Sequence, residues 1–178
     1  LVNPVAGMQT PQGFMPKPGT TSQQVRDAVL SIDELDSNDT FINEIYDACR
    51  QQNIAVDTFI SEAGMGQFEV NLMHSGDILK VADDAALFKQ VAKGVAQKHG
   101  LSACFMAKPF PEQPGSGMHV HLSMLDSQGQ NVFDDGTEQG SAVFHHAIAG
   151  ALDGMNDSML IFAPHQNSYR RFIVEAHA

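Results

Sequence analysis

Apolar residues recur at helical spacing along several stretches of the chain. The stretches that we expect to be helical are residues 39–52, 77–99, 139–152 and 158–162. Asn38 or Asp39 is a suitable N-cap for the first helix, and Gly100 is a suitable stop for the second. Each of the longer helices has one apolar stripe, which we expect to face a core.

Strand-like patterns lie between these helices. The expected strands are residues 54–62, 67–73, 102–106 and 115–123. The first two would form a hairpin around the turn at Gly64 and Gly66. Gly129 and the Asp134-Asp135-Gly136 stretch mark a second hairpin region. Strand pairs that alternate with single helices predict an α+β fold, with a curved antiparallel sheet packed by helices.

The proline- and glycine-rich residues 1–22 predict a loop or linker segment before the patterned region, residues 23–178. The length of 178 residues suffices for one domain with a substantial core. The chain begins at Leu1 without an initiator methionine and ends directly after a dense polar segment. We therefore expect it to be part of a longer protein.

Composition narrows the possible partners and compartments. With 43% hydrophobic and 17% charged residues, the chain is typical of a globular protein. A net charge of −11 without a basic run argues against nucleic acid or an anionic membrane surface as a partner. No apolar run reaches the roughly 18–20 residues of a membrane span. Cys49 and Cys104 follow no metal or redox spacing, which is typical of reduced thiols in the cytoplasm.

The first stretch with candidate chemistry is the expected hairpin, in which Glu62 and Glu69 flank a glycine-rich turn. On a strand, Glu69 would lie on the polar face, opposite the apolar residues Phe68, Val70 and Leu72. Carboxylate oxygens are the ligands that magnesium and manganese prefer. The alternative is a pair of solvated hairpin carboxylates with no ligand.

The second stretch is residues 115–123, in which His119, His121 and Ser123 alternate with apolar residues and would share one strand face. The two histidines could hold one zinc ion together, or one could bind a metal and the other a phosphate. The preceding Gly-Ser-Gly lets a ligand approach the backbone closely, and its N–H groups could bind an anion. Two ordinary surface histidines are the alternative.

The third stretch is a polar loop, residues 167–171, that ends in Arg170 and Arg171. A guanidinium group is planar and donates two parallel hydrogen bonds to a carboxylate or phosphate. A solvated basic pair is the alternative for this loop.

Together the three stretches resemble the glutamine synthetase superfamily. Residues 115–123, preceded by residues 106–109, resemble its ATP-region signature. Residues 62–69 resemble its metal-ligand hairpin, and residues 167–171 resemble its glutamate-binding loop. All three occur in the family order, and the similarity covers most of the chain from about residue 30 onward.

The resemblance implies a role for each candidate residue. The implied ligands of Mg²⁺ or Mn²⁺ are Glu62, Glu69 and His119. The implied ATP contacts are His121, Ser123 and Asp57. The implied glutamate contacts are Gly115 and Arg171, with Arg171 acting in catalysis. Asp57 has the weakest support, because on a regular strand it would face away from Glu62.

Departures from the family pattern lie around the acceptor side. Ammonia-using glutamine synthetases commonly have Asn where this chain has Pro114, and histidines where it has Ile60 and Ser61. Their Tyr-Glu-Ala-Pro segment, whose Glu helps to form the ammonium site, corresponds here to a stretch with Glu175 and His177. This pattern is similar to the γ-glutamylpolyamine synthetase branch, in which putrescine or another amine replaces ammonia.

The resemblance therefore implies an ATP-dependent ligase that joins the side chain of glutamate to an amine through a γ-glutamyl phosphate. Residues 23–178 would be a partial catalytic domain, truncated at both ends and inactive alone, from a cytoplasmic enzyme that forms a homo-oligomeric ring. The alternatives are an ammonia-using glutamine synthetase and a nucleotide- or metal-binding relative without catalysis. A zinc hydrolase that uses His119 and His121 would leave the other two motifs without a role.

Overall fold

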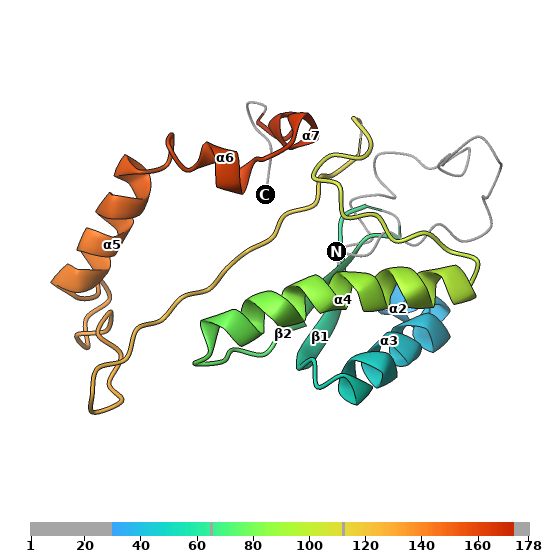
Figure 1. Cartoon of the computed structure of the whole chain (residues 1–178), viewed down its shortest axis with the longest axis horizontal. Helices are drawn as coiled ribbons and strands as arrows, with labels where there is room; N and C mark the ends of the chain where they lie inside the picture. The colour runs from blue at the N-terminus through green and yellow to red at the C-terminus, as the bar shows by residue number, and fades with distance from the viewer. Residues whose placement is uncertain (1–29, 65, 112, 173–178) are drawn as a thin grey trace. The chain divides into compact units, whose positions relative to one another are not determined.

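The computed structural model describes residues 30–64, 66–111 and 113–172 (Figure 1). Its helices are α2 (Ile32–Ser37), α3 (Asp39–Gln51), α4 (Ile78–Lys98), α5 (Ala142–Asp153), α6 (Met159–Phe162) and α7 (Gln166–Tyr169). Its strands are β1 (Val56–Ser61) and β2 (Phe68–Leu72). The chain divides into two compact units, Leu1–Ser116 and Gly117–Ala178. The loop predicted for residues 1–22 and the predicted acceptor-side residues Glu175 and His177 lie outside the described residues.

The first unit is built on the predicted hairpin. Strand β1 pairs antiparallel with β2, with Ile60 opposite Glu69 and Ser61 opposite Phe68. Gly66, in the turn, has a φ of 68°, a backbone conformation that glycine adopts without a steric penalty. The hairpin and its register confirm the strand prediction for this part of the chain.

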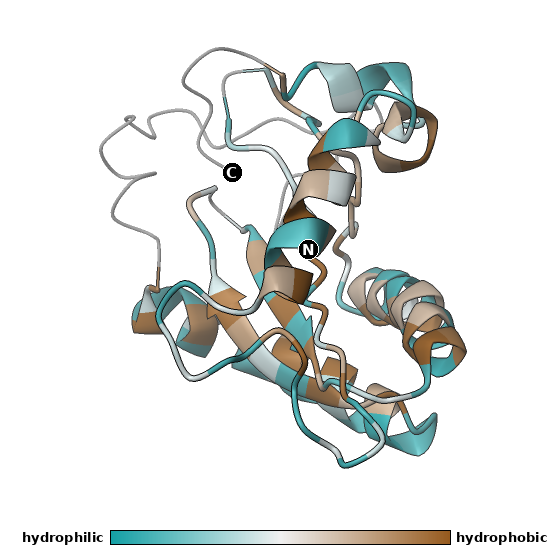
Figure 2. Ribbon diagram, turned by 90° about the vertical axis from the view of Figure 1, so that its left-hand side faces the viewer, coloured by the Kyte–Doolittle hydropathy of each residue, from teal (hydrophilic) through white to brown (hydrophobic). Residues whose placement is uncertain are grey.

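One hydrophobic core lies between this hairpin and the helices of the first unit. Helix α3 packs against α4 and β1, and α2 packs against β1. The buried side chains of this core are Phe41, Ile42, Ile45, Cys49, Ile54, Phe68, Phe88, Val91, Ala92, Val95, Ala96 and Leu101. Figure 2 shows bands of apolar and polar residues along these elements. The residues that α3 and α4 bury are apolar, as expected for helices with one face on a core.

Helix ends follow the sequence signals only in part. Asn38 is at the N-cap position of α3, but its side chain makes no capping hydrogen bond and instead donates to the Glu34 carbonyl at 2.8 Å. The Asp77 side chain accepts a hydrogen bond from the Lys80 N–H at 3.1 Å and caps the N-terminus of α4. His99 ends this helix, and Gly100 follows it with a φ of 69°. Helices α3, α5 and α6 also lie where the spacing predicts them. Helices α2 and α7, of six and four residues, were not predicted.

The strands predicted over residues 102–106 and 115–123 are wrong. Both stretches are irregular, and among the described residues the pairing outside β1 and β2 is a single bridge between Leu125 and Asn131. A strand needs a neighbour that accepts and donates its backbone hydrogen bonds, and alternation alone does not supply one. The predicted curved sheet is therefore a two-stranded antiparallel sheet, while the α+β class is confirmed.

The second unit contains an extended stretch, a turn region and helices α5, α6 and α7. In the turn region around Gly129, the Asp126 carboxylate accepts the N–H groups of Gln128 and Gln130 at 2.8 and 2.9 Å. Ser141 caps α5 by accepting a hydrogen bond from the Phe144 N–H at 3.2 Å. None of the helices in the described ranges is both long enough and apolar enough to cross a membrane.

Candidate functional site

The hairpin brings Glu62 and Glu69 to one face. Glu69 lies opposite Ile60, and the Glu62 N–H donates to the Gln67 carbonyl at 2.8 Å, which extends the pairing beyond β1. Since side chains alternate along a strand, Glu62 shares the face of Ile60 and Glu69. Phe68 and Ser61 are fully buried on the other face. Both glutamates are half-buried, and the alternation puts them on the side of the hairpin opposite Phe68 and Ser61.

A third carboxylate, that of Glu34 in α2, holds the hairpin turn in place. It accepts hydrogen bonds from the Ser61 hydroxyl at 2.5 Å and from the Gly66 N–H at 2.7 Å. The sequence reasoning missed this residue. The sequence feature that points to Glu34 is Ser31-x-x-Glu34, the pattern of a capping box at the start of a helix. In the structure the Ser31 hydroxyl accepts a hydrogen bond from the Glu34 N–H at 3.3 Å.

Gln67 joins the hairpin to the glycine loop before residue 117. Its side-chain carbonyl accepts the Gly64 N–H at 3.0 Å, and its side-chain amide donates to the Gly115 carbonyl at 2.9 Å. Next to Gly115, the Ser116 N–H donates to the Ala107 carbonyl at 2.8 Å. Two of the three predicted motifs are therefore connected directly within the first unit.

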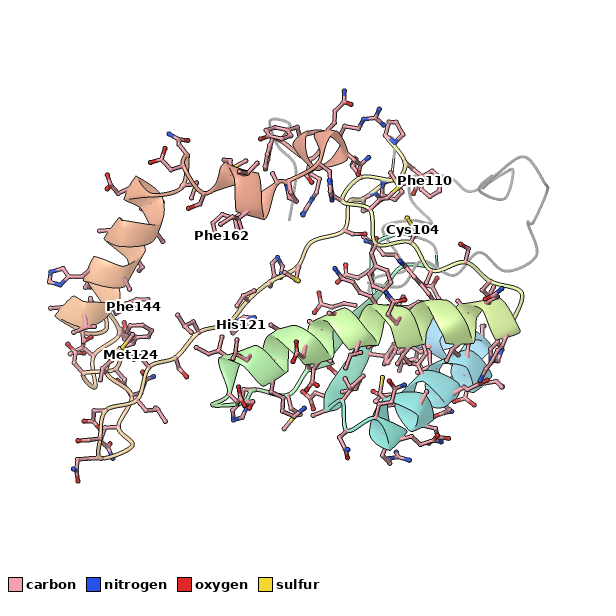
Figure 3. All side chains as sticks on the ribbon, viewed as in Figure 1. Cys104, Phe110, His121, Met124, Phe144 and Phe162 are labelled. Carbon is pink, nitrogen blue, oxygen red and sulfur yellow. The ribbon has the colours of Figure 1, made fainter. Side chains whose placement is uncertain are left out.

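In the second unit, the side chains of His119 and Arg171 both lie close to Gly117. A methyl group built on Gly117 would lie 3.4 Å from both terminal nitrogens of Arg171 and 3.7 Å from Nε2 of His119. The missing side chain leaves the guanidinium and the imidazole within reach of the same stretch of backbone. His121 lies further along this extended stretch (Figure 3). The side chains of His121 and Ser123 are exposed.

Asp57 lies apart from the two glutamates. It is the extra residue where the β1 register shifts between Val56 and Thr58, near the opposite end of the strand from Glu62. At about 3.3 Å per residue, the five intervening steps separate these two positions by roughly 16 Å. The Asp57 carbonyl accepts the Tyr46 hydroxyl at 3.3 Å, and burial, with the charge of Asp57 adding to it, raises the pKa of that phenol.

Cys49 is a core residue rather than a reactive one. It is buried in α3, and burial, with a further contribution from the charge of Asp84, raises the pKa of its thiol to about 11. The thiol is therefore protonated at neutral pH and is a poor nucleophile and metal ligand. Cys104 is also free, so neither thiol forms a disulfide.

The hairpin offers two carboxylates of the kind that a hard divalent cation prefers. Glu62 and Glu69 offer carboxylate oxygens from one half-buried face, and oxygen donors suit Mg²⁺ and Mn²⁺. The third predicted ligand, His119, belongs to the other unit. Within the described ranges no three His, Cys, Asp or Glu side chains form a group that could hold a metal ion.

Comparisons with known proteins identify the family. The model of the glutamine synthetase catalytic domain matches residues 3–178. The chain belongs to the glutamine synthetase family. It is 41% identical over 155 residues to the γ-glutamylputrescine synthetase of Escherichia coli (strain K12), covering 87% of this chain and 33% of that protein. It is 38% identical over 137 residues to a glutamate–isopropylamine ligase of a Pseudomonas species, covering 76% of this chain and 30% of the ligase.

The chain is also similar to a solved structure. A complex of GmaS with ADP has a TM-score of 0.75 and 32% identity, covering 92% of this chain and 37% of that chain. The predicted resemblance to the glutamine synthetase superfamily, and within it to the γ-glutamylputrescine branch, is confirmed. The chain spans about a third of the length of the relatives it matches. The roles of the individual site residues stay predictions.

Proposed function

We propose that the protein to which this chain belongs is an ATP-dependent ligase that joins the side-chain carboxylate of glutamate to putrescine or another polyamine. The observation that carries the proposal is the similarity to a γ-glutamylputrescine synthetase over most of the chain. Pro114 supports it, because it replaces the Asn that is common in ammonia-using enzymes, directly before the Gly115 loop.

In this proposal the hairpin carboxylates bind the metal ion that stabilises negative charge during the reaction. Glu62 and Glu69, with His119, would hold Mg²⁺ or Mn²⁺, which when bound neutralises charge on the transferring phosphoryl group. The hairpin register supports this proposal, because Glu69 pairs with Ile60 and Glu62 follows two positions after Ile60, which favours one face for both carboxylates.

The remaining residues would position the substrates. Arg171 presents both terminal nitrogens beside Gly117, a geometry suited to two parallel hydrogen bonds with the carboxylate of glutamate. Gly115 would hold the same substrate through its backbone. His121 and Ser123, both exposed, would contact ATP, and Asp57 would contact it from the distant end of β1.

The proposed reaction has two steps. A side-chain oxygen of glutamate attacks the terminal phosphorus of ATP, which forms a γ-glutamyl phosphate and releases ADP. The neutral amine then attacks the acyl carbon, phosphate leaves with the oxygen that glutamate contributed, and the nitrogen loses a proton. Positioning of the reactants in each step and stabilisation of the developing charge would supply the rate.

We further propose that this chain is inactive by itself. The family resemblance implies additional metal-ligand glutamates and substrate-binding arginines from flanking sequence, and an active site shared between subunits of a homo-oligomeric ring. The two free cysteines are in keeping with a cytoplasmic protein.

The choice of acceptor is tested by an assay of the whole protein with glutamate and ATP and either putrescine or ammonia. We expect kcat/KM for putrescine to exceed that for ammonia by at least about tenfold, since a site shaped for a longer amine gains contacts that ammonia cannot make. Phosphate release measures both reactions.

A preference for ammonia would instead identify a glutamine synthetase. ATP binding without phosphate release, with either acceptor, would identify a relative that has lost catalysis.

A further inference from the structure

We infer that Gln67 is a positioning residue that fixes the Gly115 carbonyl relative to the carboxylate hairpin. This inference rests on the proposed function, because it assumes that Glu62 and Glu69 bind the metal and that Gly115 binds glutamate. Neither the family motifs nor the alternation along the strand predicts a role for Gln67.

Gln67 is an unusual side chain in this structure. Only 4% of it is exposed, and with Ser61 it makes up the buried polar residues of the described ranges. A buried amide that lacks partners costs about 1–3 kcal/mol, so a buried Gln is retained where both of its ends are bonded. Both ends are bonded here, to Gly64 at 3.0 Å and to Gly115 at 2.9 Å.

The backbone of Gln67 adds two more connections. Its N–H donates to the Gly64 carbonyl at 2.8 Å, and its carbonyl accepts the Glu62 N–H at 2.8 Å. The residue that contacts Gly115 is therefore also the residue that pairs with Glu62 and precedes the strand of Glu69 by one position. A shift of Gly115 therefore distorts or breaks a hydrogen bond to the hairpin that carries both carboxylates.

The glycine at position 64 fits this arrangement. A methyl group built on Gly64 would lie 2.6 Å from the side-chain oxygen of Gln67 and 3.3 Å from its Cβ. Any other residue would push the amide away, so Gly64 permits the close approach that the two hydrogen bonds require. This gives a physical reason for the first glycine of the turn.

The Gly115 carbonyl, which accepts the hydrogen bond from the Gln67 amide, has two lone pairs. A hydrogen bond from Gln67 uses one of them and fixes the plane of the peptide. The other lone pair then keeps a constant direction toward an ammonium group such as that of glutamate. The neighbouring bond between Ser116 and Ala107 restrains the same loop from its other side.

The decisive variant is Gln67→Glu in the whole protein. It keeps the shape of the side chain, the acceptor for Gly64 and both backbone bonds, but it replaces the donor to Gly115 with an oxygen. The matched control is Asn71→Asp, the same amide-to-carboxylate change on β2, where the amide donates to the Thr58 hydroxyl at 3.0 Å.

We expect Gln67→Glu to raise the KM for glutamate by about tenfold or more, while the KM for ATP changes less than about twofold. We expect Asn71→Asp to leave both values unchanged. In the metal-free protein, amide hydrogen exchange should become faster at Ser116 in the Gln67→Glu variant and stay slow at Gly64, because only the bond to Gly115 is lost.

Other results would overturn the inference. An unchanged KM for glutamate, or equal rises in the KM for glutamate and ATP, would mean that Gln67 has no specific effect on the glutamate site. If Gln67→Glu does not fold, Gln67→Met conserves the volume and must still show faster exchange at Ser116.

If the wild-type protein shows no glutamate-dependent turnover, the proposed function fails. Exchange at Ser116 then decides separately whether Gln67 holds the loop.

Discussion

Glu69→Gln lowers the turnover of the whole protein by at least about 100-fold. Mutation of a residue that only supports a metal ligand typically lowers metal affinity or activity by about 10–100-fold, and loss of a ligand itself should have a larger effect. The amide has the shape of the carboxylate but lacks its charge, so the cation would be held weakly and the phosphoryl charge would be neutralised poorly. The hairpin should persist, since Glu69 lies on the face that points away from the core. Phosphate release at increasing Mg²⁺ concentration measures the effect.

A suitable control is Asp83→Asn, which removes an exposed carboxylate from α4 without touching the hairpin. We expect this variant to keep wild-type turnover. Near-normal activity of Glu69→Gln at saturating and at low Mg²⁺ would contradict the assignment of Glu69 as a metal ligand.

Phe68→Ala destabilises the protein by about 3–5 kcal/mol. Phe68 is fully buried in β2, opposite Ser61, and it belongs to the same core as the apolar residues of α3 and α4. Removing its ring leaves a cavity that the surrounding side chains fill only in part. Because a domain is typically stable by about 5–15 kcal/mol, this loss is a large part of the total. Urea unfolding followed by circular dichroism measures it.

Leu79→Ala is the control for this measurement, because Leu79 is 78% exposed on α4. We expect a change within about 0.5 kcal/mol for this variant. A change of less than about 1 kcal/mol for Phe68→Ala would mean that the hairpin is not anchored to the core in the way the structure indicates.

The elements that could be predicted from the sequence are those in which local signals agree. Helix α4 has an apolar stripe, a capping Asp77 and a following Gly100, and its bounds differ from the prediction by one residue at each end. The two faces of β2 also follow from alternation, since Phe68 is buried and Glu69 lies on the other face. In these elements propensity, caps and pattern all favour the same structure.

The features that could not be predicted depend on contacts between distant residues. Glu34 reaches Ser61, 27 positions away, and Gln67 reaches Gly115, 48 positions away. No spacing rule within a helix or strand describes such pairs. The strand predicted at His119 failed for a related reason, because the described residues offer it no pairing partner. The roles of the site residues came from the family resemblance, since the pattern alone left several chemistries open.

The central claim is that glutamate is activated as an acyl phosphate before the amine attacks. The most direct test supplies the whole protein with ATP, putrescine and glutamate whose side-chain carboxylate carries a heavy oxygen isotope. The proposed reaction transfers one labelled oxygen to phosphate in each turnover, and mass spectrometry of the released phosphate should detect it. Unlabelled phosphate in the presence of amide product would contradict the acyl phosphate, and with it the proposed mechanism.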